Sequence, residues 1–160
     1  MVSPLPLDVL MQDEFLTDAE FRAWHGCLRF SNNAMQALDQ ALRAEHEISL
    51  SEFDVLITLF NAPHHRLRMT ELSKRVLLTA SGMTQLVTRL DSRGLVSRSV
   101  DEDDRRSLFA TLTKAGHRRL REARPMHNEV VRSLFTRRLS AEQLAAMGDL
   151  WAVVAAASGK

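Results

Sequence analysis

The stretch from Met69 to Gly116 constrains the fold of this chain more than any other part of it. Its pattern predicts a short helix, a second helix that ends in glycine, a strand, a charged turn, a second strand and the start of a further helix. Two helices followed by a two-stranded hairpin can place one element in the major groove of duplex DNA and the other against the minor groove. The stretch therefore predicts a DNA-binding unit.

The second helix of this stretch has an apolar face and a polar face. Its apolar stripe follows i, i+3, i+4, i+7 spacing and consists of Met83, Leu86, Val87 and Leu90. Thr79 is a suitable N-cap, and Gly94 stands where a left-handed residue ends a helix. Small hydroxyls and an amide suit a helix that lies close to base edges and phosphates. The polar face consists of Ser81, Thr84, Gln85, Thr88 and Asp91. Taken alone, this face also fits a simply solvated surface.

The hairpin behind this helix carries the charged turn. Leu95–Val100 and Leu108–Leu112 are short β-rich runs, and the second alternates as a half-buried strand does. The turn between them reads DEDDRRS, and its arginines, Arg105 and Arg106, can insert into a narrow minor groove, where negative potential is concentrated. Asp104 stands two residues before Arg106 and can orient that guanidinium by a charge-assisted hydrogen bond. The alternative is an ordinary charged surface turn.

The distribution of charge favours the DNA-binding interpretation. Residues 1–62 carry 3 Lys/Arg and 10 Asp/Glu, a net charge of −7. Residues 63–121 carry 13 and 6, a net charge of +7, and residues 122–160 carry 5 and 4, a net charge of +1. The basic charge is thus concentrated on the predicted DNA-binding unit, which is the electrostatic pattern of a protein that binds nucleic acid.

The motifs of this region, taken in order, resemble those of a known family. They are F-D-V-L-I-T-L-F, R-M-T-E-L-S-K-R-V, S-G-M-T-Q-L-V-T-R-L-D-S-R-G-L-V, the turn D-D-R-R and L-T-K-A-G. In these motifs the chain resembles the MarR-type (multiple antibiotic resistance regulator) winged-helix transcription factors over about residues 17–156. The resemblance implies an obligate homodimer, a recognition helix at about 80–93, a wing at 101–107 and, often, control by a small ligand. The family's wing motif Asp-x-Arg falls on Asp104 and Arg106.

The fold class expected is mostly α with a small β-hairpin, a winged helix-turn-helix flanked by N- and C-terminal dimerisation helices. Many relatives carry arginine where this chain has Gln85, which suits adenine rather than guanine and puts the base preference in doubt. The expected partner is double-stranded DNA with a pseudo-palindromic operator. The expected DNA contacts are Thr79, Ser81, Thr84, Gln85, Thr88, Arg89, Arg98, Asp104, Arg105 and Arg106.

The two ends of the chain predict a helical dimerisation module. We expect a single unit over 1–160, with dimerisation helices in 17–47 and 117–156 and the winged helix-turn-helix in 49–116. Capping boxes stand at Thr17-x-x-Glu20 and Ser49-x-x-Glu52, and Ser140-x-x-Gln143 caps the last helix. The segment from His64 to Arg66 is expected to be a loop, and Pro125 to kink or break the helix that runs from Thr113 to about Arg138.

Apolar side chains at both ends are easier to bury between two subunits than within one. The expected interface residues are Phe21, Leu144, Leu150 and Trp151.

Several classes of protein are not expected. No apolar run is long enough to cross a membrane, and the first fifteen residues lack the basic start of a signal peptide. A single cysteine, Cys27, allows no internal disulfide, so a cytoplasmic location is expected. The sequence contains no catalytic motif and no histidine spacing typical of a metal site, so neither an enzyme nor a cofactor nor a metal is expected.

The function expected is a homodimeric, sequence-specific transcriptional regulator, a repressor, whose DNA affinity is modulated by a small ligand. The resemblance suggests a ligand crevice, where an indole wall and a cation would suit an aromatic anion. The candidate ligand residues are Trp24, His25, Leu28, Arg29 and Phe53. The alternative for Trp24 is a core tryptophan at the dimer interface. Alternatives for the whole chain are a non-sensing architectural DNA-binding protein and a regulator that responds to oxidation of Cys27.

Overall fold

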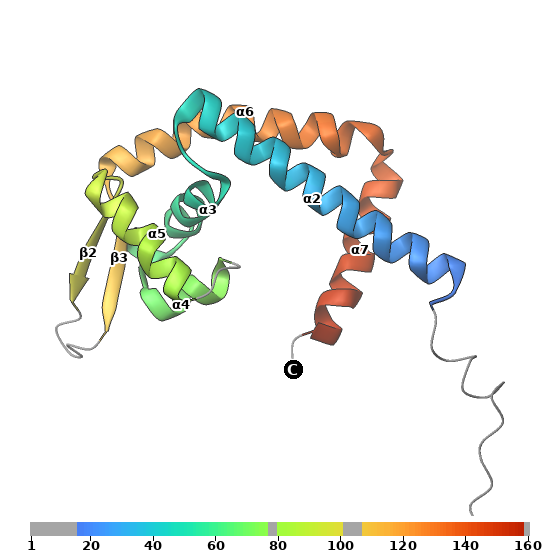
Figure 1. The fold of residues 1–160 in the computed structure, drawn as a ribbon, viewed down its shortest axis with the longest axis horizontal. Helices are drawn as coiled ribbons and strands as arrows, with labels where there is room; N and C mark the ends of the chain where they lie inside the picture. The colour runs from blue at the N-terminus through green and yellow to red at the C-terminus, as the bar shows by residue number, and fades with distance from the viewer. Residues whose placement is uncertain (1–15, 77–79, 101–106, 159–160) are drawn as a thin grey trace, which may run out of the picture. The chain divides into compact units, whose positions relative to one another are not determined.

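The computed structural model describes residues 16–76, 80–100 and 107–158 (Figure 1). The chain divides into two compact units, residues 1–36 and residues 37–160, and helix α2 contributes to both. In chain order the elements are α2 (Asp18–His46), α3 (Leu50–Phe60), the 3-10 turn η1 (Pro63–His65), β1 (Arg66–Arg68), α4 (Met69–Arg75), α5 (Ala80–Ser92), β2 (Val96–Val100), β3 (Leu108–Leu112), α6 (Lys114–Leu134), η2 (Thr136–Arg138) and α7 (Ala141–Ser158). The prediction of a mostly helical winged helix-turn-helix is confirmed.

The sheet has three antiparallel strands in the order β1-β3-β2, one more than the expected hairpin. The expectation of a loop from His64 to Arg66 is wrong at its end, because Arg66 begins β1 and the residues before it form η1. The strand forms because Leu67 is buried opposite Ala110. On the other face of the sheet the Arg66 guanidinium lies 3.7 Å from the ring centre of Phe109, a cation–π contact that holds the strand in place.

The core of the 37–160 unit lies where α3, α4 and α5 meet the sheet and α6. The predicted apolar stripe of α5 is confirmed, because Met83, Leu86, Val87 and Leu90 are all buried. These side chains pack in one cluster with residues from every neighbouring element, including Leu42, Phe53, Leu56, Leu59, Leu72, Val96, Ala110, Leu112 and Leu120. Burial on this scale fixes which face of α5 points inward and therefore which face points out.

Local signals set the helix ends. All three capping boxes form, with Ser49 and Glu52 exchanging both of the hydrogen bonds that define the motif at the start of α3. Gly94 has a φ of 69°, as expected of the residue that ends α5. Gly116 is required for close packing, because a Cβ there would stand 2.0 Å from the carbonyl oxygen of Leu95.

Helix α6 continues through Pro125, so this residue does not end the helix, and the expected kink stays a prediction. A proline removes one backbone donor, and the helix tolerates the loss because Pro125 lies on its exposed side while Leu120 and Ala123 are buried. Helix α6 ends at Leu134, and the residues expected to continue it form η2. In the part of the chain that the structure describes, no helix is both long enough and apolar enough to cross a membrane.

Candidate nucleic-acid interface

Helix α5 presents the polar face that was predicted to read DNA. Thr84, Gln85 and Thr88 are exposed, and Asp91 is half-buried. Thr79 and the side chain of Ser81 lie outside the described residues, so their part in the interface stays a prediction. Because the opposite face of α5 is locked into the core, the exposed side chains are held on a rigid support, which is the arrangement that base reading requires.

Arg98 lies on β2 and contacts α5 rather than extending into solvent. Its Nε donates to a carboxylate oxygen of Asp91 at 3.0 Å, and its Nη1 donates to the hydroxyl of Thr88 at 3.0 Å. The contact braces the wing strand against the predicted recognition helix. The predicted DNA contact by Arg98 remains a prediction, and the structure adds a bracing role that sequence reasoning missed.

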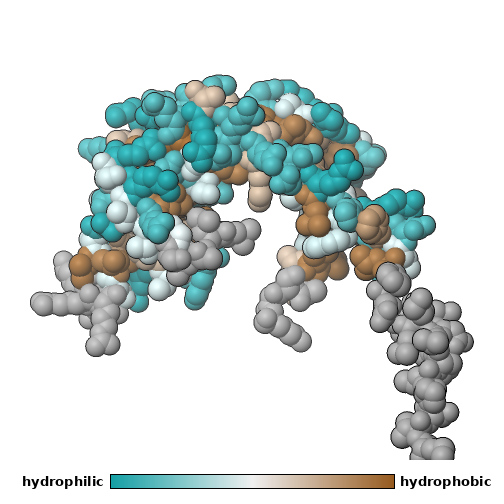
Figure 2. Space-filling view, viewed as in Figure 1, coloured by the Kyte–Doolittle hydropathy of each residue, from teal (hydrophilic) through white to brown (hydrophobic). Residues whose placement is uncertain are grey.

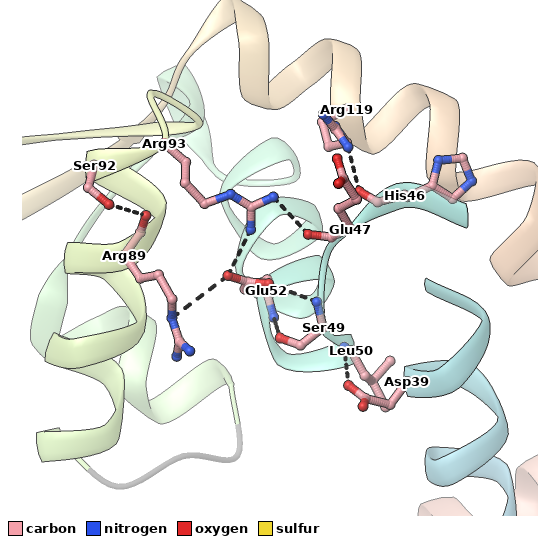
Figure 3. Close-up of polar contacts among 10 residues, drawn as sticks. All are labelled: Asp39, His46, Glu47, Ser49, Leu50, Glu52, Arg89, Ser92, Arg93 and Arg119. Atoms are coloured by element: carbon pink, nitrogen blue, oxygen red, sulfur yellow. Dashed lines mark hydrogen bonds and ion pairs between the residues drawn. The ribbon is translucent and has the colours of Figure 1, made fainter. Parts of the chain in front are cut away.

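Arg89 is an exposed cation next to the same face of α5. Its side chain is 63% exposed, and its Nε lies 3.9 Å from the Glu52 carboxylate (Figure 3). At that distance the pairing is loose, so little free energy holds Arg89 in place. An exposed guanidinium beside a reading face is suited to a DNA phosphate.

The predicted wing lies between β2 and β3. Asp104, Arg105 and Arg106 are outside the described residues, so their proposed roles stay predictions. The described part of the hairpin has an unbroken register that ends with Val100 opposite Leu108. Both of these side chains are apolar and exposed, and they form the last described pair of the hairpin before the predicted wing.

The predicted ligand residues fall in both units of the chain. Trp24, His25, Leu28 and Arg29 lie on exposed positions of α2 in the 1–36 unit, where His25 stacks on the ring of Phe21 with centres 4.2 Å apart. Phe53 is buried in the core of the 37–160 unit and stacks on His127. A ligand role for the five predicted residues is still a prediction.

A separate pocket of about 290 Å³ lies at the start of α6. Its lining is formed by His65, Leu112, Thr113, Lys114 and His117, none of which was predicted as a ligand residue. Among the residues that the structure describes, no group of three or more His, Cys, Asp or Glu side chains is arranged to hold a metal ion.

The predicted dimer contacts are mostly exposed apolar side chains. Phe21, Leu150 and Trp151 are exposed in the single chain, and Leu144 is half-buried. Figure 2 shows hydrophobic surface where Figure 1 draws α7. Large apolar groups that stay in contact with water mark surfaces that pair with another molecule.

The pairing of Glu52 with Arg93 was missed by sequence reasoning. Arg93 follows α5 and donates to Glu52 on α3 at 3.1 Å, across 41 positions of the chain. The capping box accounted for Glu52 on its own, so nothing in the local pattern indicated a second partner. Only the packing of α5 against α3 brings the two side chains together.

Comparisons with known proteins place this fold in a family. The family model described as the MarR family matches residues 48–108. Sco3205 from Streptomyces coelicolor, a MarR family transcriptional regulator solved in complex with DNA, is 32% identical with a TM-score of 0.84, and the match covers 89% of each chain. AbsC, a MarR family transcriptional regulator from the same organism, is 28% identical with a TM-score of 0.82, over 92% of this chain and 99% of AbsC.

A curated relative matches over a shorter part of the chain. The transcriptional repressor MprA of Escherichia coli strain K12 is 28% identical over 110 residues, which cover 69% of this chain. The match spans 62% of the length of MprA, so less than two thirds of that protein is represented.

Proposed function

This chain belongs to the MarR family, and from that premise we propose that it is a homodimeric, sequence-specific DNA-binding regulator of transcription. Family members are transcription regulators and not enzymes. The observation that carries the proposal is the exposed polar face of α5, formed by Thr84, Gln85 and Thr88 on a helix whose other face is buried. The same fold is found in Sco3205, which is bound to DNA.

The proposed assembly is a dimer with two reading helices. Leu150, Trp151 and Val153 on α7 are exposed in the single chain, by 65%, 46% and 70%. Burying apolar surface of this kind is worth about 25 cal/mol for each Å² removed from water. A two-fold dimer would bury each such patch against its copy and present two α5 helices to a pseudo-palindromic operator.

The proposed regulatory effect is repression, relieved by a small ligand. MprA, a relative of this chain, is a transcriptional repressor. Trp24 and Arg29 are exposed on α2 and offer an indole face and a cation, which suit an aromatic carboxylate. We place the protein in the cytoplasm, because DNA is its proposed partner and Cys27 has no second cysteine with which to form a disulfide.

The test of DNA binding is selection from a random duplex library followed by competition. We expect wild-type protein to enrich a palindromic duplex and to prefer it over a scrambled duplex of equal composition by several kcal/mol, on the order of 4 or more. Equal affinity for the two duplexes would contradict sequence-specific regulation. It would favour the second candidate, an architectural DNA-binding protein.

The test of ligand control uses the selected duplex. Titration with benzoate, as a simple aromatic carboxylate, should release the protein from DNA, and Trp24→Ala should reduce the response. The coupling available to such a ligand is typically about 1–3 kcal/mol, so release should be graded. Release that requires peroxide and is lost in Cys27→Ser would support redox control instead. An absence of response to both reagents would contradict both forms of control by these residues.

A further inference from the structure

Glu52, on the first turn of α3, is the one buried residue with a charged side chain among those whose exposure the structure describes. A buried carboxylate costs free energy unless charged or hydrogen-bonding partners surround it. One of its oxygens accepts the backbone N–H of Ser49 at 2.7 Å and completes the capping box. A glutamine would serve that purpose equally well. The cap therefore leaves the negative charge of Glu52 unexplained.

The other oxygen of Glu52 faces two arginines, Arg89 on α5 and Arg93 just after it (Figure 3). Arg93 Nη1 donates to Glu52 Oε1 at 3.1 Å, whereas Arg89 Nε stands 3.9 Å from the same oxygen. Arg93 is also the less exposed of the two, with 32% of its side chain accessible against 63% for Arg89. The carboxylate is thus held mainly by Arg93, and Arg89 is a looser second partner.

Arg93 also holds the connection between α2 and α3. Its Nη2 donates to the backbone carbonyl of Glu47 at 2.7 Å. Glu47 has a φ of 54°, an uncommon backbone conformation for a residue with a side chain. One guanidinium therefore joins the end of α5, the first turn of α3 and the turn before α3. A planar guanidinium can make both contacts at once, which an ammonium group cannot do with the same geometry.

Arg93 shares a row of side chains with the predicted base-reading residue. Gln85, Arg89 and Arg93 follow one another at intervals of four, and the helical hydrogen bond from Arg93 N–H to the Arg89 carbonyl extends the row past the end of α5. Residues four apart lie on neighbouring turns of one helix face. Holding Arg93 at one end of the row therefore adds a polar restraint to the helix rotation that the buried stripe sets, and with it to the direction in which Gln85 points.

We propose that Arg93, held by Glu52, is a positioning residue for base reading by α5, and that Arg89 is the member of the same row left to contact the DNA backbone. The proposal rests on the proposed DNA-binding function. In it, Glu52 and Arg93 touch no base. They hold the rotation of α5, and the tighter pairing of Arg93 allows Arg89 to leave Glu52 for a phosphate.

The experiment compares variants on a duplex selected from a random library by wild-type protein and on a scrambled duplex of equal composition. Glu52→Gln keeps an acceptor for the Ser49 cap and removes the charge. Arg93→Gln removes the cation, and Arg93→Lys keeps the charge but not the two-pronged contact. Arg137→Gln is the matched control, because it breaks an exposed ion pair with Glu129 on α6. Affinity is measured over a series of salt concentrations, and thermal melting checks that each variant is folded.

We expect Glu52→Gln and Arg93→Lys to lower the preference for the selected duplex by about tenfold, the cost of roughly one mismatched base pair. The salt dependence of binding should be the same in Glu52→Gln and in Glu52→Gln combined with Arg93→Gln, because Arg93 contacts no phosphate in the proposal and the neutral side chain at position 52 cannot hold Arg89 away from DNA. In the same measurement Arg89→Gln should lower the salt slope by about one. The Arg137→Gln control should match wild type.

Two results would overturn the proposal. The first is that folded Glu52→Gln and folded Arg93→Lys both prefer the selected duplex as strongly as wild type does. The second is a salt slope that falls by about one when Arg93→Gln is added to Glu52→Gln, which would make Arg93 a direct phosphate contact. If Glu52→Gln or Arg93→Gln fails to fold, Arg93→Lys alone decides the matter by the same preference ratio. A wild-type protein without any preference would instead contradict the proposed function.

Discussion

Arg98 on β2 and Asp91 on α5 form an ion pair with an N–O distance of 3.0 Å, which ties the wing strand to the helix that carries the predicted base-reading face. The same guanidinium donates to the hydroxyl of Thr88, so the contact has two points of attachment. Two elements proposed to enter different grooves of the duplex are thereby held at a fixed separation. A contact of this kind transmits no base information itself, but it limits how far either element can move alone.

Replacing Arg98 tests whether it braces or contacts DNA. Arg98→Met should lower the free energy of unfolding by about 0.5–1 kcal/mol, a modest effect because the pair is partly exposed. If Arg98 only braces α5, DNA affinity should fall with no change in its salt dependence. The measurements are thermal melting and binding across a salt series, with Arg75→Met as the control for loss of an exposed ion pair. A salt slope reduced by about one would identify Arg98 as a phosphate contact instead.

Gln85 is predicted to read one base in each half-site. Gln85→Ala should lose about 1–3 kcal/mol of discrimination at that position, while binding to unrelated DNA persists. The measurement is binding to a selected operator randomised one position at a time. An unchanged preference at every position would remove Gln85 as a base-reading residue.

The wing prediction concerns Asp104 and Arg106, which lie outside the described residues. Arg106→Ala should weaken binding to all sequences, because its proposed target is groove shape and phosphate. Asp104→Ala should have the same effect more mildly, by freeing the Arg106 side chain. Tighter binding by Asp104→Ala would show that the carboxylate merely repels DNA, and the orienting role would be wrong.

The secondary structure of the predicted DNA-binding unit was largely predictable, because its signals are local. The stripe from Met83 to Leu90 and the glycine at Gly94 are set by spacing along one helix, and the structure confirms both. The strand at Arg66–Arg68 was missed because three residues carry too little periodicity to indicate a strand, and its support comes from pairing with β3, about forty positions later.

The contacts that orient the reading helix could not be predicted in the same way. The pairing of Glu52 with Arg93 depends on how α5 packs against α3, and no spacing rule links two residues 41 positions apart. Pro125 is a second case in which packing matters, because helix α6 continues through it. Helix α6 has buried residues before Pro125, and those contacts hold the helix together without one backbone hydrogen bond.

The pH dependence of stability should reveal the contribution of the Asp39 carboxylate to the folded state. The hydrogen bond from Arg43 to its carboxylate lowers the pKa of Asp39 below the ordinary 3.8, and the backbone N–H of Leu50 adds to the effect. The folded state therefore favours the charged form. Its contribution to stability is complete above the ordinary pKa and is lost as the pH falls through the lower pKa of the folded state.

Asp39→Asn removes that contribution. Wild type should be more stable than the variant by a few tenths to about 1 kcal/mol at neutral pH, since the pair with Arg43 is largely exposed. The difference should shrink as the pH falls below about 4. The measurement is the free energy of unfolding of both proteins by denaturant at a series of pH values. A difference that stays constant into acid would show that the charge of Asp39 is not the source of the stability.

The central claim is that two copies of this chain read two half-sites on one face of the duplex. Sedimentation of the protein with the selected duplex, repeated after moving the half-sites apart by about five base pairs, tests it most directly. We predict a complex of two chains on one duplex when the half-site centres are about 10–10.5 base pairs apart, and a loss of that complex when the spacing changes by half a turn. A single chain on the duplex, or equal binding at both spacings, would contradict the claim.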